Sequence, residues 1–125
     1  MKKNVVKDKS FCFALKIINL CKYLQADKKE FILSKQLVRS GTAIGALICE
    51  STHAESKADF IHKIAIAQKE THETEYWIEL LFQSNYLNED EYKSVITDIM
   101  ELKKILASIS ITSKEKYGKK LIHHS

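Results

Sequence analysis

The chain contains no proline and only three glycines in its 125 residues. Because most tight turns are built on those two residue types, their scarcity favours long helices joined by short polar loops. A chain of this length fits one domain, and folding buries about two-thirds of the surface that the unfolded chain exposes. The sequence therefore predicts a single all-α domain that spans residues 1–125.

Four helical segments are expected, and each has a start signal. Ser10 is the expected N-cap of a first helix that ends near Gln25. The other three starts have the spacing of a capping box, in which two side chains three residues apart bond each other's backbone N–H groups. These pairs are Asp27 with Glu30, Ser56 with Asp59, and Asn88 with Glu91.

The fourth segment has the strongest helical pattern. Its apolar residues follow alternating steps of three and four, at Tyr92, Val95, Ile99, Leu102, Leu106 and Ile109. The second segment is expected to end near His53 and the third between Ser84 and Leu87. Helices two to four then extend roughly 36 to 45 Å at a rise of 1.5 Å per residue. We predict an elongated up-down-up-down antiparallel four-helix bundle.

The first segment is apolar over more than half of its circumference. One apolar row consists of Phe11, Leu15, Ile18 and Cys21, and a second row consists of Phe13, Ile17, Leu20 and Leu24. Polar side chains occupy the remaining face, which is expected to contact water or a polar neighbour.

Positive charge is concentrated at the two ends of the chain. The net charge is +4, with a surplus of three positive charges in residues 1–9 and another three in residues 113–125, so the central part is slightly acidic. Basic ends can contact phosphate groups, and several copies in one assembly would multiply that attraction. Solvated tails without a ligand are an interpretation of equal weight, and residues 1–9 and 113–125 are expected to be flexible.

The three cysteines are odd in number and form no C-x-x-C pair. Cys12, Cys21 and Cys49 have apolar neighbours in the sequence, which predicts buried reduced thiols and neither a disulfide nor a zinc site. The N-terminal residues lack a signal-peptide pattern, and no run of 18 apolar residues is present. We therefore expect a cytoplasmic protein with no membrane partner.

Small residues form a line along the second segment. Ser34, Gly41, Gly45 and Cys49 lie close to one face of a helix. Each glycine costs a helix about 1 kcal/mol relative to alanine, and a solvent-facing stripe would gain nothing in return. We therefore predict a contact surface at Gly41 and Gly45, either inside the bundle or between subunits.

A polar stretch, Gln68 to Tyr76, interrupts the apolar pattern of the third segment. Antiparallel neighbours would bring it close to the middle of the second segment, which carries Arg39. Our hypothesis is a partly buried ion pair between Arg39 and either Glu73 or Glu75 that fixes the register of the two helices. A surface network of charges is the alternative.

The sequence shows no pattern typical of a catalytic or cofactor site. Glu50 and His53 form an E-x-x-H motif, but di-metal bundles need that motif on two helices, and here it occurs once. No zinc spacing, glycine-rich phosphate loop or nucleophile motif is present. The other histidines are His62, His72, His123 and His124. We therefore expect no enzyme activity, no catalytic residue, no metal and no cofactor.

Two stretches of the chain carry a resemblance to a known family. These are "RSGTAIGALICES", residues 39–51, and "SKADFIHKIAIAQKETHETEYWIELL", residues 56–81. They resemble the four-helix-bundle proteins encoded by intervening sequences in bacterial 23S ribosomal RNA genes. The resemblance extends over roughly residues 10–112. Matching positions are Arg39, Ser40, Gly41, Glu50, Ser56, Lys57, Phe60, Glu73, Glu75, Tyr76 and Trp77.

The resemblance implies an up-down-up-down bundle that assembles into a ring-like homopentamer. Within that family, residues for helix packing or assembly would be Arg39, Gly41, Gly45, Glu50, Glu73 and Glu75. Leu47 departs from the pattern, since family members often carry Asn there, and Ser51 stands where Ala or Gly is usual. A polar function at residue 47 is therefore not expected.

The family is also similar to the accessory proteins of diversity-generating retroelements, pentamers that bind nucleic acid and a reverse transcriptase. By that analogy the expected partner is RNA or DNA. The expected function is that of a non-enzymatic oligomer whose lysines contact phosphates. These lysines are Lys2, Lys3, Lys114, Lys116, Lys119 and Lys120. The alternative is a structural or adaptor protein whose oligomer binds a protein partner.

Overall fold

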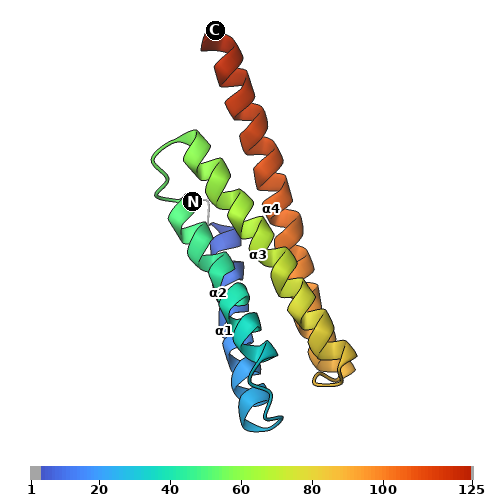
Figure 1. The fold of residues 1–125 in the computed structure, drawn as a ribbon. Helices are drawn as coiled ribbons and strands as arrows, with labels where there is room; N and C mark the ends of the chain where they lie inside the picture. The colour runs from blue at the N-terminus through green and yellow to red at the C-terminus, as the bar shows by residue number, and fades with distance from the viewer. Residues whose placement is uncertain (1–3, 125) are drawn as a thin grey trace.

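The computed structural model describes residues 4–124, with side chains up to residue 119. It contains four helices that run alternately in opposite directions (Figure 1). Their bounds are α1 (Val5–Ala26), α2 (Leu33–Ser51), α3 (Lys57–Gln83) and α4 (Glu89–His124). The described residues include no strand. The expected all-α antiparallel four-helix bundle is confirmed.

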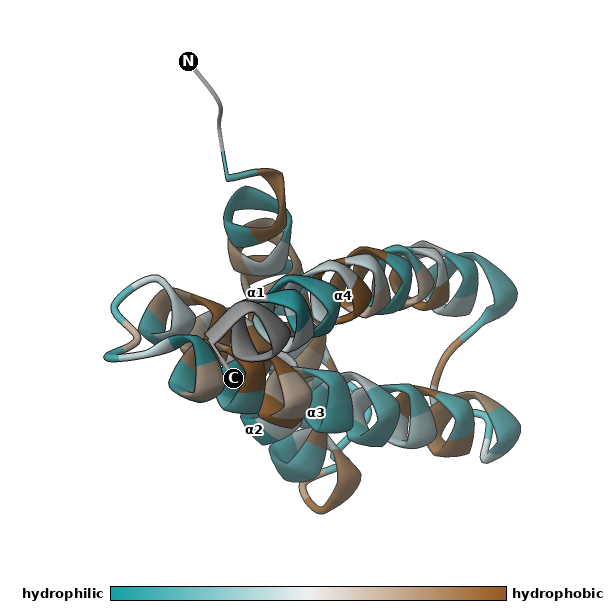
Figure 2. Ribbon diagram, turned by 90° about the horizontal axis from the view of Figure 1, so that it is seen from above, coloured by the Kyte–Doolittle hydropathy of each residue, from teal (hydrophilic) through white to brown (hydrophobic). Residues whose placement is uncertain are grey.

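The helices form two antiparallel hairpins that share one core. Helix α2 packs against α1 and α3, α3 packs against α4, and the contact between α1 and α4 is smaller. The α1–α2 and α3–α4 turns lie apart in two perpendicular views, so the hairpins diverge toward that end (Figure 1, Figure 2). The largest fully buried apolar side chains are Ile17, Leu24, Leu37, Ile44, Ile48, Ile64, Ile78, Leu81, Ile99, Leu102 and Leu106.

Helix α1 begins earlier than the sequence predicts. Its N-cap is Asn4, whose side-chain oxygen accepts a hydrogen bond from the Lys7 backbone N–H at 3.1 Å. Ser10 is buried within the helix, and its hydroxyl donates to the Lys7 carbonyl at 3.0 Å. The prediction of Ser10 as the cap is wrong because Asn4 already satisfies a free N–H of the first turn.

The start of α2 also differs from the prediction of a capping box at Asp27 and Glu30. Lys29 has a φ of 55°, which turns the chain, and Glu30 lies before α2 in the turn. The Glu30 carboxylate accepts hydrogen bonds from the backbone N–H groups of Ile32, Leu33 and Ser34 at 3.1, 3.0 and 2.7 Å. Glu30 thus caps α2 from outside the helix, with only 7% of its surface exposed.

Replacing Glu30 with alanine is expected to lower the free energy of unfolding by about 1–3 kcal/mol. The change removes the acceptor for three N–H groups, of which that of Ser34 belongs to a buried residue. Urea unfolding followed by circular dichroism would measure the loss. Asp27→Ala, at the exposed position that the sequence suggested as the cap, should have little effect, and equal losses for both variants would contradict this role of Glu30.

The predicted N-caps Ser56 and Asn88 are both present, but only α4 has the full capping box, because at α3 the Asp59 carboxylate accepts from the Glu55 N–H at 3.2 Å and not from Ser56. The Ser56 hydroxyl accepts from the Asp59 N–H at 3.0 Å. The side chains of Asn88 and Glu91 each accept from the other's backbone N–H at 2.8 Å, which is a complete capping box. Both caps satisfy first-turn donors with side chains local in sequence.

The ends of the chain are more helical than the sequence predicts. Residues 5–9 belong to α1, and α4 continues through residues 113–124 where flexible tails were expected. Lysine and glutamate are good helix formers, and Gly118, the one glycine in this segment, is accommodated in the helix. The last part of α4 projects beyond the α2–α3 turn (Figure 1). Within the described residues, no helix is both long and apolar enough to cross a bilayer.

Candidate functional site

Gly41 and Gly45 lie where α2 approaches α1 of the same chain. A Cβ atom at Gly41 would lie 3.0 Å from the Cγ2 atom of Ile17, and one at Gly45 would lie 3.4 Å from the Ser10 hydroxyl oxygen. Of the two interpretations that the sequence left open, the close approach inside the bundle is therefore present. Ser34 on the same line is buried, whereas Cys49 is exposed.

Arg39 reaches across from α2 to two carboxylates of α3. Its guanidinium pairs with Glu73 and also lies 3.4 Å from Glu70. Glu75, the alternative partner, instead accepts from the Lys103 ammonium of α4 at 2.6 Å. The Arg39 side chain is 49% exposed, so the pair contributes at most about 1 kcal/mol to stability. Its role in register or assembly stays a prediction.

The polar stretch of α3 is partly buried against α2 through hydroxyl groups. Thr74 Oγ1 lies 2.9 Å from Ser40 Oγ and 2.7 Å from the Glu70 carbonyl oxygen, and both residues of the hydroxyl pair are buried. Thr71 is also buried, and its hydroxyl donates to the Gln68 carbonyl at 2.6 Å. These contacts satisfy polar atoms inside the bundle, which sequence reasoning did not assign.

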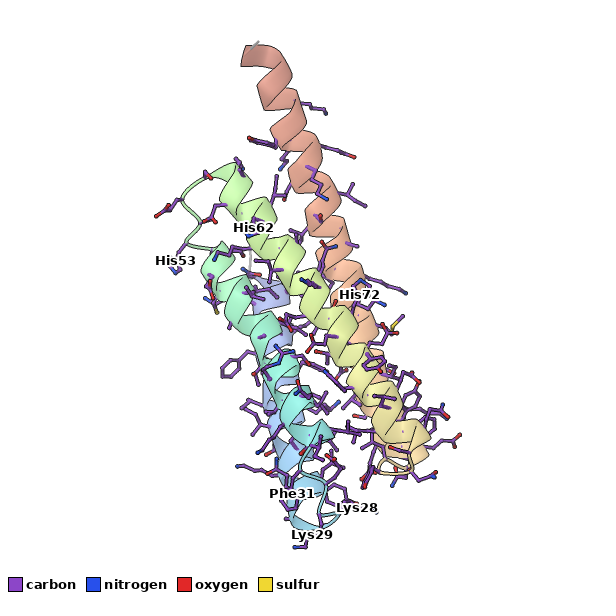
Figure 3. All side chains as sticks on the ribbon, viewed as in Figure 1. Lys28, Lys29, Phe31, His53, His62 and His72 are labelled. Atoms are coloured by element: carbon purple, nitrogen blue, oxygen red, sulfur yellow. The ribbon has the colours of Figure 1, made fainter. Side chains whose placement is uncertain are left out.

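Glu50 and His53 of the E-x-x-H motif line the same hollow beside the α2–α3 turn. Glu50 pairs with the Lys63 ammonium at 3.0 Å. His53 lies in the α2–α3 turn, and His62 and His72 lie at different points along α3 (Figure 3). Among the described residues, no three or more histidine, cysteine, aspartate or glutamate side chains are grouped as metal ligands.

Only one of the three cysteines matches the expectation of a buried thiol. Cys21 is buried and donates to the Ser34 carbonyl at 3.3 Å. Burial, with a smaller contribution from the Glu30 charge, raises the pKa of the Cys21 thiol to about 12, so it stays protonated at neutral pH. Cys12 and Cys49 are exposed, and the prediction for them is wrong because both lie on helix faces turned away from the core, although Phe13 and Ile48 beside them in the sequence are buried.

Cys12 and Cys49 line a hollow between α1 and α2, which we call the α1–α2 hollow. It has a volume of ≈ 560 Å³. Phe11 and Leu15 on its α1 side are 64% and 49% exposed. Its lining is Lys7, Asp8, Ser10, Phe11, Cys12, Ala14, Leu15, Ile18, Thr42, Gly45, Ala46 and Cys49. The first apolar row of α1, which contains Phe11, Leu15 and Ile18, was the sequence signal for this surface.

A second hollow, the turn groove, lies between the α2–α3 turn and α4 and has a volume of ≈ 390 Å³. It contains Lys116, one of the lysines predicted to contact phosphates, together with Lys57, which was not assigned that role. The full lining is Ser51, Thr52, Ala54, Ser56, Lys57, Phe60, Thr112, Ser113 and Lys116.

The other predicted phosphate-contacting lysines differ in how much of them the structure describes. Lys114 and Lys119 are exposed on the last part of α4, in the same helix as Lys116. Lys2 and Lys3 lie outside the described residues, and so does the side chain of Lys120. Four of the six lysines thus lie on α4, and the side chains of three of them are described.

Comparison with known proteins gives a family and a crystal structure. Residues 2–108 match the family described as 23S rRNA-intervening sequence protein. The chain is 52% identical to a protein with unknown function from the S23 ribosomal protein family of Bacteroides thetaiotaomicron VPI-5482, whose crystal structure aligns with a TM-score of 0.83. The alignment covers 84% of this chain and 97% of that one. No curated protein matches the chain.

Proposed function

The chain belongs to the 23S rRNA-intervening sequence protein family, and on that premise we propose that it is a non-enzymatic oligomer that binds RNA or DNA through its lysines. The observation that carries the proposal is the projecting end of α4. Lys114, Lys116 and Lys119 are exposed there, with Glu115 as the one carboxylate among residues 113–119. A helix that extends beyond the bundle holds these charges away from the acidic central part of the chain, where a phosphate backbone can approach.

Assembly of several copies is supported by the α1–α2 hollow. Exposed apolar side chains gathered on one face, such as Phe11 and Leu15, are typical of protein interfaces. We propose that a second copy of the chain covers this face. The homopentamer that the family resemblance implies would place five sets of lysines in one particle and strengthen phosphate binding.

The test is binding of the purified protein to labelled structured RNA and to duplex DNA across a salt series. We expect affinity to fall steeply with salt, because phosphate neutralisation releases counterions. Replacing Lys114, Lys116 and Lys119 together with glutamine should lower the slope of log affinity against log salt by about 2–3, since each phosphate contact contributes roughly 0.7–0.9. Glutamine retains high helix propensity, so α4 should persist.

The matched control replaces three exposed lysines near the α1–α2 turn with glutamine, namely Lys22, Lys28 and Lys35. This control changes the net charge equally but lies at the opposite end of the bundle from the projecting part of α4 (Figure 1). An equal loss of slope in both triple variants would show a diffuse charge effect. Mass in solution, measured alongside, reports whether assembly is intact.

The alternative function is an adaptor whose oligomer binds a protein partner. A specific observation favours it: Phe31 and Ile32 are exposed on the short α1–α2 turn, next to Lys28 and Lys29 (Figure 3). Glu30 between them is held in place by its three backbone hydrogen bonds, so the turn presents these apolar side chains in a defined position. An assembled protein that is indifferent to both nucleic acids would support this alternative.

A further inference from the structure

The turn groove brings together segments that are far apart in the sequence. The end of α2 and the following turn contribute Ser51, Thr52, Ala54 and Ser56. The first turn of α3 contributes Lys57 and Phe60, and α4 contributes Thr112, Ser113 and Lys116. Lys57 and Lys116 are both exposed, and neither forms an ion pair with another described residue. Their positive charges are therefore available to a ligand.

The lining of the turn groove suits an anion that accepts hydrogen bonds. No carboxylate lines it, and five hydroxyl groups do. The Ser51 and Thr52 hydroxyls donate to carbonyl oxygens of α2 at 2.6 and 2.7 Å, so their protons are not offered to a ligand. The Ser56 hydroxyl accepts from the Asp59 N–H, so its own proton is free to be donated. Ammonium and hydroxyl donors without a competing carboxylate match the oxygen atoms of a phosphate group.

Other residues of the same turn and its flanking helices form a surface of the reverse character. A separate hollow there is lined by three carboxylates, Glu50, Glu55 and Asp59, together with Lys63. The Lys63 ammonium is engaged by Glu50, and its pKa is raised by that hydrogen bond. The α2–α3 turn thus borders both an acidic hollow and a basic one, and only the one that α4 lines would attract a polyanion.

We infer that the turn groove holds a backbone phosphate of the bound nucleic acid, with Lys57 and Lys116 as its two charged contacts. The inference rests on the proposed function and adds to it a site and a residue, Lys57, outside the basic ends. Lys119 lies one helical turn beyond Lys116 on α4, so the strand would continue from the groove along the projecting helix. Recognition of this kind positions a nucleic acid without reading its sequence.

The test compares Lys57→Gln, Lys116→Gln and the double variant in the same salt series. Each single change is expected to lower the slope of log affinity against log salt by about 1, and the double change by about 2. Lys104→Gln is the matched control, because Lys104 is exposed on α4 but lines a different surface, with Ile96 and Met100. It should change the slope less than either groove variant.

The outcomes separate the inference from the function on which it rests. If the wild-type protein binds nucleic acid and Lys57→Gln behaves like Lys104→Gln, the groove is not the contact, while nucleic-acid binding stands. If the wild type binds neither RNA nor DNA, both the proposed function and the inference about the turn groove are wrong. Inorganic phosphate alone is titrated against the backbone amide NMR signals of Ser56 and Lys57. Shifts without nucleic-acid binding would identify a site for a free anion and overturn the inference.

Discussion

Replacing Gly41 with valine is expected to lower the free energy of unfolding by about 2–3 kcal/mol, as overpacking of a well-packed core does. Gly41 is buried where α2 meets α1, and a Cβ atom there would lie 3.0 Å from Ile17 Cγ2 and 3.3 Å from its Cγ1. Ile17 is fully buried, and its β-branched side chain has few alternative rotamers in a helix. The two helices must therefore move apart to accept the larger side chain.

A double-mutant cycle tests this explanation directly. Gly41→Ala alone combines the clash with a gain of about 1 kcal/mol in helix propensity, so its net effect is smaller than that of valine. Ile17→Ala removes the two nearest carbon atoms, and in that background Gly41→Ala should stabilise the protein. A change in the sign of the Gly41→Ala effect between the two backgrounds would demonstrate energetic coupling between residues 17 and 41. Additive effects would show that Ile17 is not what excludes a side chain at residue 41.

Gly118 provides the matched control for the glycine substitutions. It lies in α4, and a Cβ atom there would meet nothing within 4 Å. Gly118→Val is therefore expected to leave stability unchanged or slightly raised, since valine has the better helix propensity. Chemical unfolding of both valine variants would compare them, and equal losses would contradict the packing role of Gly41.

The helix starts show which local patterns the sequence determines. Ser56 and Asn88 were predicted correctly because their caps involve only side chains and N–H groups within one helical turn. Asp27 and Glu30 have the same spacing, but the Glu30 N–H donates to the Leu24 carbonyl at 3.0 Å and the chain turns at Lys29. That conformation depends on burial of Glu30 between α1 and α2, which spacing alone does not reveal.

The sequence predicted that Arg39 pairs with a carboxylate of α3. It left open whether the partner is Glu73 or Glu75, because that depends on the rotation of the helix. Glu73 and Glu75 are two residues apart, so they point to nearly opposite sides of α3. One of them can face α2, and the structure assigns that position to Glu73, while Glu75 faces Lys103 of α4. Sequence periodicity could show that Glu73 and Glu75 cannot both pair with Arg39. It could not show which of them does, because packing fixes the rotation of α3.

The orientation of α1 was unpredictable for a related reason. Both of its rows are apolar, so hydrophobic periodicity gives no preference for which row faces the core. In the structure Phe13, Ile17 and Leu24 of one row are buried, whereas Phe11 and Leu15 of the other are exposed. Assembly through this outer row would explain why a single chain carries both.

Phe11→Asp is therefore expected to convert the assembled protein to a monomer without unfolding it. Phe11 is 64% exposed in the single chain, so its loss costs the isolated fold little, whereas a charge buried in an apolar interface is strongly unfavourable. Light scattering would measure the mass, and circular dichroism the helix content. Ile111→Asp is the control, since Ile111 is 58% exposed on α4 away from the α1–α2 hollow and should leave the mass unchanged.

The reactivity of the cysteines is an independent test of whether copies of the chain meet at the α1–α2 hollow. Cys12 and Cys49 line the α1–α2 hollow, so a thiol reagent should modify them slowly in the assembled protein and rapidly in Phe11→Asp. Cys21 should stay unreactive in both, because it is buried and its pKa is raised to about 12. If Cys12 and Cys49 react at full rate in an assembled wild-type protein, the copies meet through another face. In that case the proposal that a second copy covers the α1–α2 hollow would be wrong.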